Sequence, residues 1–258
     1  MTIVPGGRTS ARVEKGLERL LSVQRPLVLA NVRAIRRRHP EATPAEVITI
    51  LERHYLAAVT TGGAAVGASA VIPGVGIGIS LALSGVETAG FLEASALFAQ
   101  SITEVHGIAV EDPERARTLV MTMMLGTAGS DLVRQLAGQA AGTGPNRSRF
   151  WGELVTKSLP TRTLNSIGNR MRTVFVRRFA TREGANVVGR TIPFGIGALI
   201  GGTGNHMLGC KVVTSSRGAF GPAPDVFPAV FEAAVKPARV TTARTRISLP
   251  RFVRRAKD

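Results

Sequence analysis

Cysteine is almost absent from this chain of 258 residues, in which Cys210 stands alone. A single cysteine excludes an intramolecular disulfide framework and a zinc site built from cysteines, and it favours a reducing, cytoplasmic setting. Aromatic residues are also scarce, with ten Phe, one Tyr and one Trp against 29 glycines. A core of this composition is expected to depend on close approach of backbones more than on large side chains.

Long apolar runs are missing as well. A helix that crosses a membrane needs about 20 consecutive apolar residues, and glycine or proline interrupts every candidate segment here. The sequence therefore predicts no straightforward transmembrane helix. The first fifteen residues contain no apolar run, so they predict no secretory signal peptide.

Acidic residues are few, with 17 Asp and Glu against 33 Lys and Arg, which gives a net charge of +16. Two segments hold much of the excess: residues 145–190 carry ten basic and two acidic residues, and residues 236–258 carry eight and one. Such a balance implies an anionic partner, either nucleic acid or acidic lipid headgroups, and does not choose between them.

The spacing of apolar residues predicts helices throughout. Apolar residues recur every three or four positions over 13–21, 47–55 and 164–175, the last within a basic helix expected at 161–182. Thr43-Pro44-Ala45-Glu46 is a capping box, and Asp112-Pro113-Glu114 begins another helix with Asp112 as its cap. No alternating strand pattern is present. The predicted fold class is all-α, with glycine-rich helical hairpins packed against amphipathic helices. The segments at 161–182 and 191–215 are expected to pack on the central hairpin.

The stretch from Leu56 to Val86 contains 31 residues without a charge, and Pro73-Gly74 divides it into two arms. Each arm is shorter than a full membrane span, so we expect a helical hairpin that is buried or dipped into one leaflet. A second glycine-rich apolar stretch covers 191–209. Glycines four residues apart share one helical face. Those expected at helix contacts are Gly63, Gly67, Gly197 and Gly201.

These patterns divide the chain into three parts. Residues 1–44 are expected to form basic N-terminal helices, and residues 45–220 a helical core. From Gly221 onward, repeated proline among arginine and threonine predicts a flexible, disordered basic tail over 221–258.

Three motifs follow one another along the chain: the interrupted apolar hairpin at 62–86, the segment from His106-Gly107 to Glu111-Asp112-Pro113-Glu114-Arg115, and the block from Ile192-Pro193 through Gly201-Gly202 to Asn205. Together, and in this order, they resemble the EcsC family of bacterial proteins. His106 departs from the pattern, because the family usually has an aromatic residue there. The resemblance covers roughly residues 45–220.

The resemblance implies a helical, membrane-associated accessory protein, because the family is named for a gene beside an ABC-transporter pair. It carries over no catalytic residue. Gly201, Gly202 and Asn205 match a family motif of unknown role, and His206 lies beside them, so these four residues form the candidate functional motif.

Other residue patterns lack the spacing of a known catalytic, nucleotide-binding or metal site. Gly204 and Gly209 are followed by Cys210-Lys211, which lacks the Gly-Lys-Ser/Thr of a nucleotide-binding loop. The four histidines have no metal-ligand spacing. The sequence thus predicts no catalytic, cofactor-binding or metal site. Carboxylates beside the apolar hairpin are costly unless they meet a partner. The candidate buried charges are Glu87 and Glu93, with Glu104 further along the same helix and Arg178 and Arg190 as their partners.

The preferred functional hypothesis is a non-enzymatic accessory or binding protein on the cytoplasmic face of the cell membrane, linked to an envelope or ABC-transport system. Its glycine-rich hairpins would insert shallowly, while its arginine-rich segments would attract an anionic membrane surface. A basic nucleic-acid-binding protein is the alternative, although no recognition helix or aromatic-basic platform is evident. An enzyme of unrecognised type, with polar groups converging on Asn205 and His206, is the second alternative.

Overall fold

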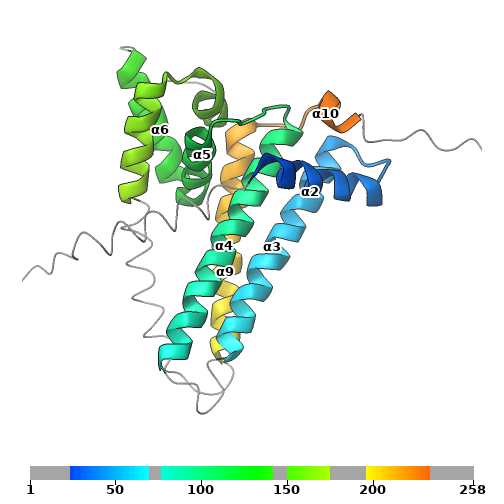
Figure 1. The fold of residues 1–258 in the computed structure, drawn as a ribbon, viewed down its shortest axis with the longest axis vertical. Helices are drawn as coiled ribbons and strands as arrows, with labels where there is room; N and C mark the ends of the chain where they lie inside the picture. Colours follow the sequence, from blue (N-terminus) through cyan, green and yellow to red (C-terminus); the bar gives the residue numbers. More distant parts are fainter. Residues whose placement is uncertain (1–23, 70–76, 142–149, 175–195, 233–258) are drawn as a thin grey trace, which may run out of the picture.

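The computed structural model describes residues 24–69, 77–141, 150–174 and 196–232 (Figure 1). Most of these residues are helical, and none of them forms a strand. The predicted all-α class is confirmed. The amphipathic segment predicted at 13–21 and the turn at Pro73-Gly74 lie outside the described residues.

Three long helices form the centre of the molecule: α3 (Pro44–Ser69), α4 (Ile77–Val105) and α9 (Ile196–Phe220). Helix α3 runs antiparallel to both α4 and α9 and packs most extensively against α9 (Figure 1). Helices α3 and α4 pack antiparallel, as the hairpin expected between residues 56 and 86 requires, and its turn lies outside the described residues. Most of the segment at 191–215, which was expected to pack on this hairpin, lies in α9 against α3.

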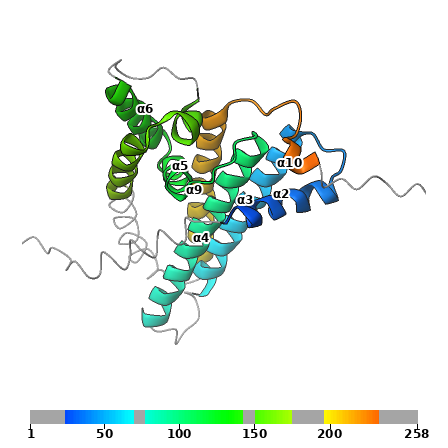
Figure 2. The same ribbon diagram turned by 45° about the horizontal axis from the view of Figure 1, so that its top comes forward.

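Shorter helices surround one end of this three-helix bundle. Helix α2 (Arg25–Arg38) packs across α4, while α5 (Pro113–Leu125) and α6 (Thr127–Ala141) lie on the other side (Figures 1 and 2). A short helical turn, α7 (Trp151–Glu153), continues into a π-helical turn, η1 (Leu154–Ser158). Residues 161–174 are helical, as predicted, and the rest of the segment expected at 161–182 lies outside the described residues.

The helix starts follow from local chemistry. At the start of α3, the Thr43 backbone N–H donates to Glu46 Oε2 at 2.8 Å, and the Glu46 N–H donates to Thr43 Oγ1 at 3.3 Å. These two bonds confirm the predicted capping box. The first of them, together with the bond that the Thr43 hydroxyl donates to Glu46 Oε2 at 3.0 Å, holds the pKa of Glu46 below its ordinary value. Asp112 accepts a hydrogen bond from the Glu114 N–H at 2.9 Å and caps α5 as expected.

One buried apolar cluster joins the parts that the sequence separated at residues 44 and 220. It includes Val32 and Ile35 of α2, residues of α3, α4, α5 and α9, and Phe231 of the short helix α10 (Ala229–Glu232). The tail prediction is therefore wrong for residues 221–232, which the fold uses. Phe231 is 0% exposed. The composition of this segment did not reveal its burial, because Phe231 is one large apolar residue in a stretch rich in proline. Residues 233–258 lie outside the described residues.

Candidate functional site

Glycines of α9 bring that helix close to α3. A Cβ placed on Gly202 would lie 3.3 Å from the Ala64 Cβ and 3.4 Å from the Thr60 carbonyl oxygen, while one on Gly209 would lie 2.9 Å from Leu56 Cδ2. Gly202 is part of the candidate motif, and Gly201 precedes it in the same helix. The motif therefore lies along the contact between α3 and α9.

Asn205 connects all three long helices. Its side-chain amide donates to the Val59 carbonyl oxygen of α3 at 3.3 Å and to Glu87 Oε1 of α4 at 3.0 Å. The carbonyl of Val59 already accepts within its own helix, so the amide uses its second lone pair. Asn205 and Glu87, predicted separately from the sequence, are thus direct partners. Glu87 is half-buried.

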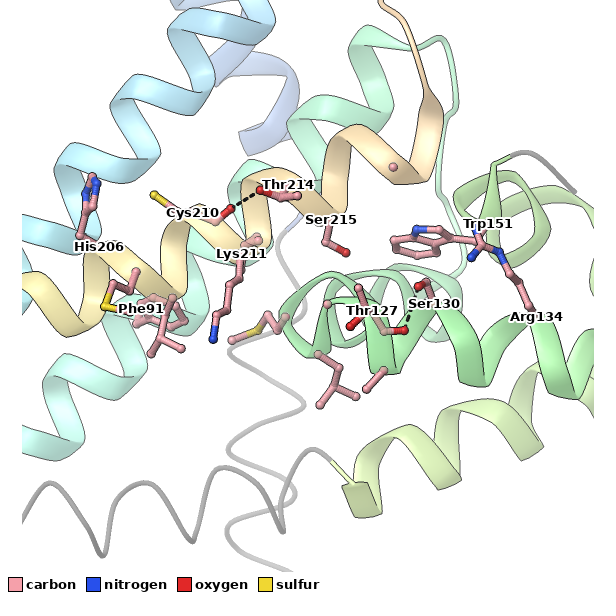
Figure 3. Close-up of a pocket in the computed structure, with 18 residues that line it drawn as sticks. Phe91, Thr127, Ser130, Arg134, Trp151, His206, Cys210, Lys211, Thr214 and Ser215 are labelled. Carbon is pink, nitrogen blue, oxygen red and sulfur yellow. Dashed lines mark hydrogen bonds between the residues drawn. The ribbon is translucent and has the colours of Figure 1, made fainter. Parts of the chain in front are cut away.

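His206 contacts α3 rather than a shared polar centre. Its Nδ1 lies 3.1 Å from Thr60 Oγ1, and the side chain points toward α3 in Figure 3. The polar groups of Asn205 and His206 are therefore engaged in helix contacts.

Not all of the charged residues that the sequence predicts to be buried are buried in the structure. Glu93 is exposed on α4, so the expectation of burial was wrong for this residue. Its register explains this, because Glu93 falls on the opposite side of α4 from buried Ser95 and Phe98. Arg178 and Arg190 lie outside the described residues.

The most deeply buried carboxylates have arginine partners that the sequence did not indicate. Glu104 is 4% exposed and accepts from Arg25 Nε of α2 at 2.6 Å. Glu52 of α3 is 5% exposed and accepts from Arg217 Nε of α9 at 2.8 Å. Each pair joins helices far apart in the chain, and no local spacing pattern could have revealed it.

A buried chain of hydrogen bonds also joins α3 to α4. Ser95 donates its hydroxyl proton to the Phe91 carbonyl oxygen at 2.7 Å, so Tyr55 must donate to Ser95 Oγ, 2.8 Å away. The Tyr55 ring stacks on Phe98 with centroids 4.7 Å apart. Burial raises the pKa of Tyr55, which keeps the phenol protonated as this donor.

A cavity of about 810 Å³ lies beside α9, across from the junction of α5 and α6 (Figure 3). The turn at this junction uses Gly126, whose positive φ of 64° suits glycine. Residues 206–218 of α9 form one wall, and Phe91 and Trp151 lie on others. Sequence reasoning missed this cavity, since its lining residues come from five helices: α4, α5, α6, α7 and α9.

Comparisons with known proteins give no match, whether to a family model, a curated protein or a solved structure. Among the described helices, none is long and apolar enough to cross a membrane. The described residues also contain no group of three or more His, Cys, Asp or Glu side chains placed to hold a metal ion.

His106 gives the fold a testable pH dependence. Its ring packs against Phe220 with centroids 5.2 Å apart, and burial lowers the pKa of the imidazole. The unfolded chain therefore binds a proton more readily than the folded one near pH 6.5. The free energy of unfolding should fall as pH drops through this region.

His106→Phe retains a ring against Phe220 and removes the titration. Urea unfolding at pH 7.5 and 5.5 should show a smaller loss of stability in the variant than in the wild type. Equal losses in the two proteins would contradict the assignment to His106.

Proposed function

We propose that this chain is a membrane-associated binding or accessory protein that inserts one end of its three-helix bundle into the cytoplasmic leaflet. The observation that supports this proposal is the distribution of charge along α3, α4 and α9. Residues 56–69, 77–86 and 196–210 of these helices contain no Asp, Glu, Lys or Arg. These three segments lie side by side at the end of the bundle away from α2 and α5 (Figure 1). We call them the uncharged end.

The dimensions of the uncharged end fit one leaflet. Residues 77–86 of α4 extend about 15 Å at 1.5 Å per residue, which is half of the roughly 30 Å hydrocarbon core. Glu87 follows directly and accepts from Asn205, so the first carboxylate of α4 stands where the apolar part ends. Val86 and Met207, near this boundary, are 68% and 59% exposed. Exposed apolar side chains beside an uncharged surface favour contact with lipid.

Electrostatic attraction would supplement this insertion. The basic excess of residues 145–190 and 236–258 is a property of the sequence. Each Lys or Arg near an anionic leaflet contributes about 1 kcal/mol at low ionic strength. The further link to a transport or envelope system rests on the resemblance to the EcsC family alone.

A charge placed on the uncharged end tests the proposal. Ala65 is exposed on α3, so Ala65→Glu should leave the fold intact. Placing a charged side chain within the hydrocarbon costs about 2.5–3.5 kcal/mol, and 1.4 kcal/mol corresponds to a tenfold change in partitioning. Flotation with vesicles that contain acidic phospholipid should therefore show binding weaker by about tenfold or more.

Ala45→Glu is the matched control, because Ala45 is exposed on the same helix about 30 Å away. It adds the same charge and should bind vesicles like the wild type. Equal weakening by both substitutions would show that vesicle binding depends on surface charge and not on insertion of the uncharged end. Tight binding to RNA or DNA without any vesicle binding would favour the nucleic-acid alternative instead.

A further inference from the structure

The cavity beside α9 has the size and lining of a ligand site. Its volume of about 810 Å³ falls within the range of roughly 300–1,000 Å³ that is usual for small-molecule pockets. Large apolar side chains form much of its wall. They are Phe91, Met124, Leu125, Trp151, Met207 and Val212.

The charges in this cavity have one sign. Of the eighteen described residues that line it, none is acidic, while Lys211 and Arg134 are basic. Lys211 extends from α9 between Phe91 and the α5–α6 junction, and Arg134 lies at the far end beside Trp151 (Figure 3). Arg134 pairs at 3.8 Å with Asp131 of the same helix. Lys211 makes no ion pair with any described residue.

We propose that this cavity binds a single-chain lipid anion, such as a fatty acid or a lysophosphatidate. The acyl chain lies against Met124, Leu125 and Trp151, and the carboxylate or phosphate head pairs with Lys211. Lys211 is the better head-group partner, because its ammonium is exposed and unpaired among the described residues, whereas Arg134 is already partly neutralised. The site overlaps the uncharged end at residues 206–210 of α9, and a titration without vesicles tests it apart from membrane insertion.

The chain carries its own reporter for this site. Trp151 is the single tryptophan, it is 2% exposed, and it lines the cavity. Bromine atoms quench indole fluorescence only by close approach, so a brominated lipid adsorbed elsewhere leaves Trp151 unchanged. Cys210, the single cysteine, also lines the cavity and is half-buried.

The experiment titrates the full-length protein with 9,10-dibromostearate in vesicle-free buffer, below the concentration at which the lipid forms micelles. Saturable quenching of Trp151 and slower thiol labelling of Cys210 are expected. Lys211→Gln should weaken binding by about tenfold or more, because a charge-assisted interaction is lost. Lys157→Gln removes the same charge from an exposed position outside the cavity and should not change binding. Lysophosphatidate should displace the brominated acid, and inorganic phosphate should not.

Two further measurements make the result decisive. The methyl ester of the brominated acid has the same chain without the charge and should bind at least about tenfold more weakly. Ser215, which points into the cavity in Figure 3, can be replaced by phenylalanine to fill the space. Ser215→Phe should abolish quenching while retaining a cooperative thermal transition.

Equal binding of acid and ester, or wild-type affinity in Lys211→Gln, would overturn the recognition of an anion. Unchanged binding to a folded Ser215→Phe protein would show that the lipid binds elsewhere. Absence of any quenching would overturn the site itself. Because no vesicles are present, each of these results is independent of the flotation of Ala65→Glu.

Discussion

Gly202→Leu should lower the free energy of unfolding by about 3 kcal/mol, since overpacking of a close helix contact costs roughly 1–3 kcal/mol and sometimes more. Even a Cβ at this position lies within 3.4 Å of the Thr60 carbonyl oxygen, which is part of a helix backbone and cannot rotate away. The remaining leucine atoms would push α9 off α3 and lengthen the Asn205 hydrogen bonds. For a chain of this length, 3 kcal/mol corresponds to a melting temperature lower by about 6–12 °C.

Gly204→Leu is the control for this substitution. Gly204 lies in the same helix, and a Cβ added there meets nothing within 4 Å. The change should therefore leave the melting temperature the same or raise it slightly, because leucine favours helix over glycine by close to 1 kcal/mol. Similar melting of the two variants would show that α3 and α9 do not depend on close approach at Gly202.

Phe231→Ala should cost about 3–5 kcal/mol of unfolding free energy, the usual loss for a fully buried phenylalanine. Two arginines of α2 hold the segment that carries Phe231. Arg33 donates to the Val230 carbonyl at 3.1 Å, and Arg36 donates to the Phe231 carbonyl. The Arg36 guanidinium also lies 4.0 Å from the centre of the Phe227 ring. Chemical denaturation should detect the loss directly.

Val226 provides the comparison within the same segment. It is 72% exposed, so Val226→Ala should change stability by less than about 0.5 kcal/mol. If Phe231→Ala proved equally neutral, residues 221–232 would contribute nothing to the core. The original expectation of a tail from Gly221 onward would then stand.

Features that depend on neighbouring residues could be predicted from the sequence. The capping box at Thr43, the cap at Asp112 and the helical period near Leu164 each arise within a few positions. The all-α class follows from these periods. The resemblance to a family motif, rather than a local pattern, singled out Gly202 and Asn205, and the structure places them where α9 meets its neighbouring helices.

Features that depend on distant pairing could not be predicted in this way. A glycine face shows that a backbone can approach, but it does not specify which helix will do so. The sequence therefore indicated that the segment at 191–215 packs on the hairpin, but not that it packs mainly on α3 rather than on α4. It assigned basic partners from the 178–190 region to Glu104, whose partner is Arg25. The cavity was missed for the same reason, because its walls meet only after the helices have packed.

The pairing of α3 with α9 also has a consequence for biosynthesis. Glu52 and Arg217 are 165 residues apart in the sequence, yet they form an ion pair between α3 and α9. At about 5–20 residues per second, α3 would emerge from the ribosome roughly 8–30 s before its partner is complete. During that interval α9 is not available to pack against the uncharged segments of α3 and α4. The exposed apolar segments of such a nascent chain would favour contact with a chaperone or with the bilayer. The order of synthesis would allow this contact before α9 packs against α3.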